Sequence, residues 1–143
     1  MAFVSSAASL IVCLRAKYRY VFWRPVHAIQ RADTDGNPAT ERDPEWQSLL
    51  IVNHPEYPSG HGCFSGAVIP AIAAFFGTNL VEVTVSSTVT GTNRTYSNLK
   101  AIARDVFMAR IYSGLHFRST MAAGFNLGKH VTRYVLANYF GIV

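Results

Sequence analysis

The stretch Asn53-His-Pro-Glu-Tyr-Pro-Ser-Gly-His61 decides how this chain is organised, because an extended approach ends in it and a helix begins in it. The two prolines, Pro55 and Pro58, favour extended backbone up to Ser59. The apolar run that follows predicts a helix from about residue 59 to residue 76, with Gly77 as its stop. Free backbone amides at such a helix start favour an anion, and glycine at Gly60 permits its close approach.

Helical patterns lie on both sides of this stretch. Arg24-Pro25 ends or kinks the first helix, and Ser97 is a good N-cap for the third. The segment 33–44 is a polar, turn-rich loop, and the Val/Thr/Ser-rich segment 82–95 is either a strand or an extended excursion between helices. We therefore predict an all-α helical bundle with one long, partly extended loop. The other helices are expected at about residues 5–20, 97–112 and 116 or 119 to 140.

Composition fits one domain over residues 1–143. Half of the residues are hydrophobic and 15% are charged, which is typical of helices buried on more than one side. The net charge of +5 suits an anionic ligand, a nucleic acid or an acidic membrane surface equally. The apolar run 2–14 is short of the roughly 20 residues that a membrane span needs, so we interpret it as a core helix, with a signal-type segment as the minor alternative. Basic residues elsewhere are scattered and form no nucleic-acid stripe.

Three short motifs, in order along the chain, carry the residue types that bind a tetrahedral oxyanion. They are Lys17 with Arg24-Pro25, then Pro58-Ser-Gly-His61, then Arg110 with His116. Arginine offers a planar fork of donors suited to phosphate-like oxygens, and lysine acts as a point charge. The two histidines can supply a proton donor or acceptor and a nucleophile or direct ligand.

Each motif alone has a plainer interpretation. A lysine and an arginine on one helix usually form a solvated face, Pro-Ser-Gly-His can be a simple capped helix start, and His116 can be a core histidine. The three motifs in this order, each with suitable internal spacing, favour one oxyanion site.

On these motifs the chain resembles the vanadium-dependent haloperoxidases and the related type-2 phosphatidic acid phosphatase superfamily, which includes bacterial class A acid phosphatases. The longer context Phe22-Trp-Arg-Pro-Val-His-Ala-Ile29, together with the stretch 54–61, is similar to haloperoxidase-related proteins in particular. The resemblance covers about residues 17–124. It implies a helical bundle, a vanadate cofactor with phosphate able to occupy the same site, and small-molecule substrates: halide and hydrogen peroxide, or a phosphate ester.

The resemblance also implies a role for each motif residue. His61 would be the acid–base group, and His116 would bind vanadium directly or attack phosphorus. His54 falls where bromide-preferring members carry a histidine, although a loop histidine packed beside Pro55 is an equal alternative. The charge on the equatorial oxygens of vanadate or phosphate would be neutralised by Lys17, Arg24 and Arg110. Ser59 and the Gly60 amide would add hydrogen bonds.

Two departures from the family pattern bear on activity. The position four residues after His116, often acidic in the family, is Thr120 here, so we expect a less well-supported His116. Family members also carry further helices before the lysine motif. We expect either that a homo-oligomer partner or larger assembly completes the bundle, or that the chain is a fragment or a degenerate relative. The leading hypothesis is a vanadate-dependent haloperoxidase-like enzyme. The alternatives are a metal-free acid phosphatase working through phosphohistidine and a catalytically silent subunit.

Overall fold

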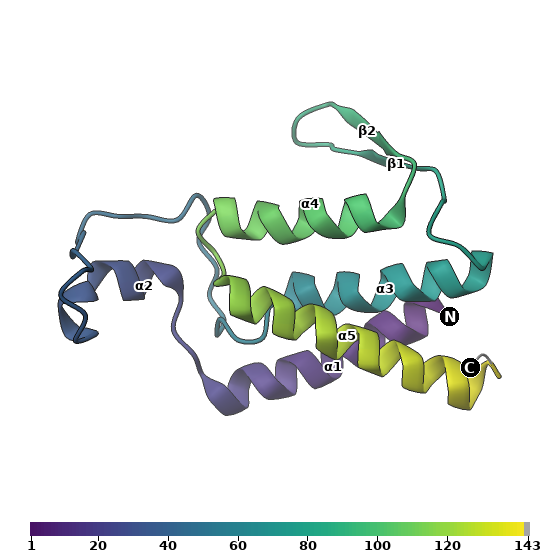
Figure 1. Ribbon diagram of the computed structural model, residues 1–143, viewed down its shortest axis with the longest axis horizontal. Helices are drawn as coiled ribbons and strands as arrows, with labels where there is room; N and C mark the ends of the chain where they lie inside the picture. Colours follow the sequence, from purple (N-terminus) through teal and green to yellow (C-terminus); the bar gives the residue numbers. More distant parts are fainter. Residues whose placement is uncertain (142–143) are drawn as a thin grey trace.

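The computed structural model describes residues 1–141, so the last two residues of the expected single domain lie outside it. Four long helices run along the molecule, and a small hairpin projects from one side (Figure 1). This confirms the predicted all-α bundle. The elements are α1 (Ala2–Tyr20), α2 (Pro25–Gln30), the 3-10 turn η1 (Ala32–Thr34), α3 (Gly60–Phe76), β1 (Val83–Ser86), β2 (Asn93–Tyr96), α4 (Leu99–Tyr112) and α5 (Arg118–Tyr139).

Local capping explains where the helices begin and end. The Ser59 side chain accepts a hydrogen bond from the Gly62 amide and starts α3, and Gly77 ends α3 in the left-handed conformation, at φ 68°. The predicted cap of α4 was wrong by one residue, because Asn98 accepts from the Lys100 amide at 2.9 Å. The helix α2 was not predicted. It begins at Pro25, since proline fits the first helical position, where no amide donor is needed.

The long extended segment forms an antiparallel hairpin. β1 pairs with β2 in the register Val83 with Tyr96 and Ser86 with Asn93. The strands are mostly exposed, and Arg94 and Tyr96 both contact Asp105 of α4 through hydrogen bonds of 2.7 and 2.9 Å. The hairpin therefore leans on α4 and adds little to the core.

Glycines bring α3 and α5 into direct backbone contact. A Cβ placed on Gly66 would lie 2.5 Å from the Phe125 carbonyl oxygen, and one on Gly124 would lie 2.6 Å from the Ser59 carbonyl oxygen. Only glycine avoids these clashes. The Thr132 hydroxyl closes the far end of this contact by donating to the Ala67 carbonyl at 2.9 Å. The close approach sets the start of α5 beside the start of α3.

The helix α1 packs with its small and polar side, which corrects the expectation of an ordinary apolar core helix. Its buried residues are Ser5, Ser6, Ser9, Cys13 and Lys17, spaced along one face. Larger apolar side chains of α1, such as those of Phe3 and Ile11, are exposed. Small residues face inwards because a tight helix contact leaves no room for large ones. Within residues 1–141 no helix combines the length and apolar character that a membrane crossing requires.

We predict that Gly66→Ala destabilises the fold. Alanine is the better helix former, by about 1 kcal/mol, yet its methyl group would press on the backbone of α5. Overpacking of this kind costs about 1–3 kcal/mol, so the free energy of unfolding in urea should fall. Asn126→Ala, on the exposed side of α5, is the matched control and should leave stability equal or slightly higher. A stabilised Gly66→Ala variant would contradict the close α3–α5 contact.

Candidate active site

The motif residues come from five different segments and meet at one end of the bundle. Lys17 lies near the end of α1, Arg24 between α1 and α2, and Arg110 in the last turn of α4. His61 lies in the first turn of α3, and His116 lies just before α5. The ends of α1 and α4 and the starts of α3 and α5 lie together in Figure 1. Several contacts join these segments directly, as follows.

Lys17 is buried at the junction of α1 and the segment before α3. Its Nζ donates to the Pro55 carbonyl at 2.7 Å and to the Glu56 carbonyl at 3.1 Å. Its Cε would lie 3.8 Å from a Cβ on Gly60, so the ammonium stem runs beside the start of α3. Burial holds the pKa of Lys17 below its ordinary value. Among the effects that lower this pKa, the charge of Arg24 is the second in size.

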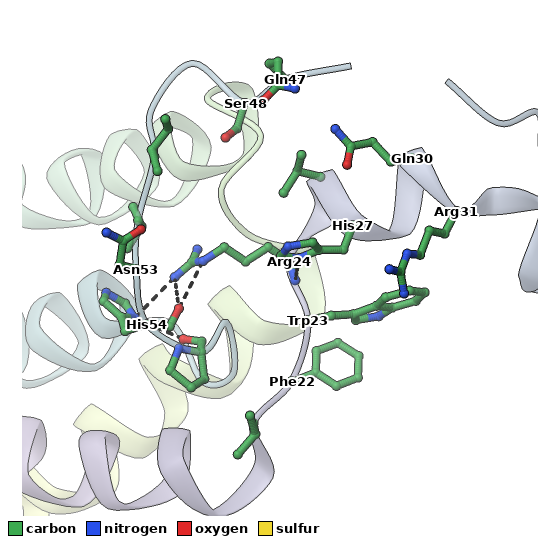
Figure 2. A pocket seen from close by; sticks show the side chains of 15 residues that line it. Phe22, Trp23, Arg24, His27, Gln30, Arg31, Gln47, Ser48, Asn53 and His54 are labelled. Atoms are coloured by element: carbon green, nitrogen blue, oxygen red, sulfur yellow. Dashed lines mark hydrogen bonds between the residues drawn. The ribbon is translucent and has the colours of Figure 1, made fainter. Parts of the chain in front are cut away.

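Arg24 spans the gap between the segment before α3 and the α4–α5 connection. Its Nη1 donates to the Leu115 carbonyl at 2.7 Å, and its Nε and Nη2 donate to the His54 carbonyl at 3.2 and 2.9 Å. Figure 2 shows this side chain extending from the α2 side towards His54. Burial is the main cause that lowers the pKa of Arg24, and the nearby Glu56 carboxylate opposes it. The guanidinium plane is therefore fixed by backbone groups on two sides.

Glu56 is a site residue that the sequence interpretation missed. Its side chain is fully buried, and Oε1 accepts from the His116 Nδ1 at 2.7 Å, the Phe117 amide at 3.1 Å and the Thr120 hydroxyl at 2.5 Å. Its own amide donates to the Phe22 carbonyl at 3.0 Å. A buried carboxylate requires such partners, since an unpaired charge is costly in the protein interior.

This contact corrects the expectation that His116 lacks an acidic partner. The carboxylate comes from the segment before α3, and Thr120 donates to the carboxylate and does not replace it. The sequence carried one signal, because Glu56 stands within the stretch 53–61 that also holds His61. Because Glu56 and His116 lie 60 residues apart in the sequence, their hydrogen bond could not be predicted without the fold.

The contact also fixes the chemical state of His116. With Glu56 ionised, its Oε1 can only accept, and the 2.7 Å contact then places the imidazole proton on the His116 Nδ1. Burial lowers the pKa of His116, although the hydrogen bond and the charge of Glu56 act in the opposite direction. A neutral imidazole protonated on Nδ1 keeps the Nε2 lone pair free for a metal or a phosphorus atom.

The start of α3 supplies hydrogen-bond donors. Ser59 is fully buried, and its Oγ accepts from the Gly62 amide at 3.2 Å, which leaves its hydroxyl proton for another acceptor. The first amides of α3, from Gly60 onwards, have no acceptor within the helix. The helix dipole adds a partial positive charge at this end.

His61 is the exposed member of the cluster. Loss of hydration lowers its pKa first, followed by the nearby charges of Arg110, His116, His54 and Lys17, in that order. Their charges therefore act on the His61 imidazole, which is itself exposed to solvent. A histidine in this position can exchange protons with solvent and with a bound oxyanion.

Arg110 brings the third permanent positive charge. It is half-buried, and its Nε is a buried donor without a hydrogen-bond partner among the described residues. An orphaned donor beside Arg24 fits a tetrahedral oxyanion, because such a ligand accepts several hydrogen bonds at once. The donor set of Lys17, Arg24, Arg110 and the α3 amides is thus suited to vanadate or phosphate.

His54 is held against Arg24 and at the same time against its neighbour Pro55. Its Nδ1 lies 3.3 Å from the Arg24 Nη2 and 3.1 Å from the Pro55 carbonyl oxygen. Burial lowers its pKa, and the charges of Lys17, Arg24 and Arg110 lower it further. His54 is therefore packed beside Pro55 and also contacts Arg24, while its role at a halide site stays a prediction.

The fold is a helical bundle with cations and histidines gathered at one end, and comparison with known proteins places the chain in a family. The chain matches the VCPO second helical-bundle domain over residues 1–142, and it belongs to this domain family of the vanadium haloperoxidases. A comparison with curated proteins found no match.

Solved structures agree with this assignment. The chain is similar to the first bacterial vanadium-dependent iodoperoxidase, with a TM-score of 0.79, 25% identity, and coverage of 95% of this chain and 32% of that one. It also shares its fold with bacterial vanadium-dependent chloroperoxidase in the apo form (TM-score 0.75, 22% identity, 94% and 35% coverage) and in the holo form (0.74, 24%, 92% and 33%). The chain thus spans about a third of the length of these structures.

We predict that Arg110 depresses the pKa of His61. In the ligand-free chain His61 should release its proton below the ordinary pKa of 6.5, so that it is mostly neutral at pH 6.5. Arg110→Gln removes a nearby positive charge and should raise this pKa, as NMR titration of the ring protons would show. Arg104→Gln, an exposed arginine on the same helix, is the control and should leave it unchanged. A lower His61 pKa in the Arg110→Gln variant would contradict the proximity of Arg110 to His61.

Proposed function

We propose that this chain carries the vanadate site of a haloperoxidase-type enzyme, which oxidises a halide with hydrogen peroxide. The observation that carries the proposal is the Glu56–His116 contact at 2.7 Å, beside three buried or half-buried cations. The contact leaves the His116 Nε2 free to bind a metal. The cations near it would bind the oxygens of an oxyanion. The membership of the domain family and the printed names of the similar structures support the same chemistry.

The chain's own residues divide the work. The Nε2 of His116 would hold vanadium, and Glu56 would keep that nitrogen unprotonated. Lys17, Arg24 and Arg110 would offset the charge of the oxygens. The Ser59 hydroxyl and the Gly60 amide would add hydrogen bonds. Bound vanadate would supply the Lewis-acidic centre that activates peroxide.

The net reaction consumes one proton and yields hypohalous acid and water from hydrogen peroxide and halide. His61 is suited to accept this proton, because it is the exposed histidine of the cluster and its lowered pKa keeps the ring mostly unprotonated near neutral pH. His54 lies against Arg24, where a halide anion would be attracted. We infer bromide as the halide, because the position of His54 resembles that of a histidine in bromide-preferring members of the family.

The test is vanadate-dependent bromination. We expect the chain to brominate a phenol-type dye with peroxide only after loading with orthovanadate, and His116→Ala to abolish the reaction. Glu56→Gln should weaken orthovanadate binding, followed by equilibrium dialysis, by about 10–100-fold, as is typical when the partner of a metal-binding histidine is changed.

His130→Ala serves as the control, because His130 is an exposed histidine on α5 away from the cluster. It should retain both binding and bromination. Full bromination in His116→Ala, or bromination without vanadate, would overturn the proposal. Circular dichroism of each variant separates loss of the site from loss of the fold.

The second candidate is a metal-free phosphatase, and the same Glu56 contact favours it. A histidine oriented by a carboxylate can act as a nucleophile. His116 would attack phosphorus, the alcohol would leave with a proton from His61, and water would hydrolyse the phosphohistidine. Orthovanadate separates the candidates, since it would activate the haloperoxidase and inhibit hydrolysis of p-nitrophenyl phosphate.

We also infer that the exposed apolar face of α1 is covered in a homo-oligomer. Phe3 and Ile11 are 92% and 69% exposed, and the neighbouring Leu14 and Tyr18 extend the same apolar surface. Exposed apolar patches of this kind mark interaction surfaces. A catalytically silent subunit of a larger assembly would use the same face, and the bromination test separates it from an enzyme.

We predict that the isolated chain self-associates. Light scattering after size exclusion should give a mass above the 15.8 kDa of one chain. The double variant Ile11→Gln and Leu14→Gln should shift the mass towards the monomer, because it removes apolar area from the contact. Thr88→Gln, an exposed change in the hairpin loop, is the control. A monodisperse monomer at all concentrations would contradict the inference.

A further inference from the structure

An open cleft of about 870 Å³ lies beside the cluster, between the α1–α2 connection, α2 and the segment before α3 (Figure 2). Ligand-binding clefts are typically about 300–1,000 Å³ in volume. Two hydrogen bonds hold its walls: the Gln30 Nε2 donates to the Trp46 carbonyl at 2.9 Å, and the Glu56 backbone amide donates to the Phe22 carbonyl at 3.0 Å. The cleft is therefore part of the folded structure.

The charges of the cleft favour an anion. Arg24 and Arg31 line it together with His27 and His54, and none of its fifteen lining residues is aspartate or glutamate. The Arg31 side chain is exposed at the rim and can turn its fork of donors towards a ligand.

The apolar surface of the cleft favours a flat ring. Phe22 and Trp23 both line it and are 45% and 38% exposed. Figure 2 shows the Trp23 indole and the Arg31 guanidinium on the same side of the cleft. An exposed indole beside a cation offers a stacking surface and an anion partner at once.

The cleft is continuous with the oxyanion cluster. Arg24 and His54 line the cleft and are also hydrogen-bonded to each other within the cluster. Arg24 further contacts the Leu115 carbonyl, one residue before His116. A molecule in the cleft is thus close to the reacting end of the bundle.

We propose that this cleft binds a flat aromatic molecule with an anionic group, its ring on Trp23 and its charge on Arg31. Resting on the proposed haloperoxidase function, this molecule is the organic acceptor. Hypohalous acid transfers halogen to a ring carbon, the carbon–hydrogen bond breaks, and the hydrogen leaves with hydroxide as water.

The experiment measures binding without vanadate, peroxide or halide, so that it is independent of turnover. Trp46→Phe leaves Trp23 as the only tryptophan of the chain. Titration with 4-hydroxybenzoate should quench its fluorescence to saturation, and Arg31→Gln in the same background should weaken the affinity roughly tenfold, equivalent to the loss of one charged contact. Arg133→Gln, an exposed arginine on α5, is the control and should change nothing.

Two further ligands test the chemical class. The neutral amide 4-hydroxybenzamide should bind about tenfold more weakly than the acid, and acetate should not compete, because it lacks the ring. If Trp46→Phe fails to fold, calorimetric titration with 4-hydroxybenzoate repeats the measurement by comparing the unaltered chain with Trp23→Leu. Absent saturation, or equal affinity in Arg31→Gln, would overturn the proposal. Saturable binding together with failed bromination would refute the proposed function alone.

Discussion

The buried carboxylate of Glu56 is the group on which the arrangement of the site depends. Its Oε1 accepts three hydrogen bonds from residues at the start of the α5 region. Its backbone carbonyl accepts from the Lys17 ammonium, and its backbone amide donates to the Phe22 carbonyl. Removing a charge from water is costly, so a fully buried carboxylate persists only where such donors and cations surround it. One residue thereby joins the end of α1, the segment before α3 and the start of α5, and the same contact sets the proton on His116.

Helix packing makes this network possible. The glycine contact between α3 and α5 lets the Ser59 amide donate to the Thr120 carbonyl at 3.2 Å, which fixes the two helix starts side by side. At this point the α3 amides, the cations and His116 converge. Larger side chains at Gly66 or Gly124 would separate the helices, and the oxyanion donors would then lie on different surfaces.

The same tight packing leaves a large part of the apolar surface outside. The small residues of α1 face α3, so its larger apolar side chains face away from the bundle. The cationic cluster is likewise open on the side of His61 and of the aromatic cleft. A chain that spans about a third of the length of these solved structures thus gathers the cations, histidines and helix-start amides on which the proposed oxyanion site rests.

The sequence alone determined the four long helices and the oxyanion motifs, because capping residues and short-range spacing act locally. Ser59 and Gly77 bound α3 as predicted, and the all-α bundle was correctly predicted. It did not determine α2, the Asn98 cap or the side of α1 that is buried, since these depend on competition between neighbouring residues and on packing. Above all, only the tertiary structure paired Glu56 with His116. A hydrogen bond between residues 60 positions apart leaves no periodic trace in the sequence, and it forms because the glycine contact brings the two helix starts together.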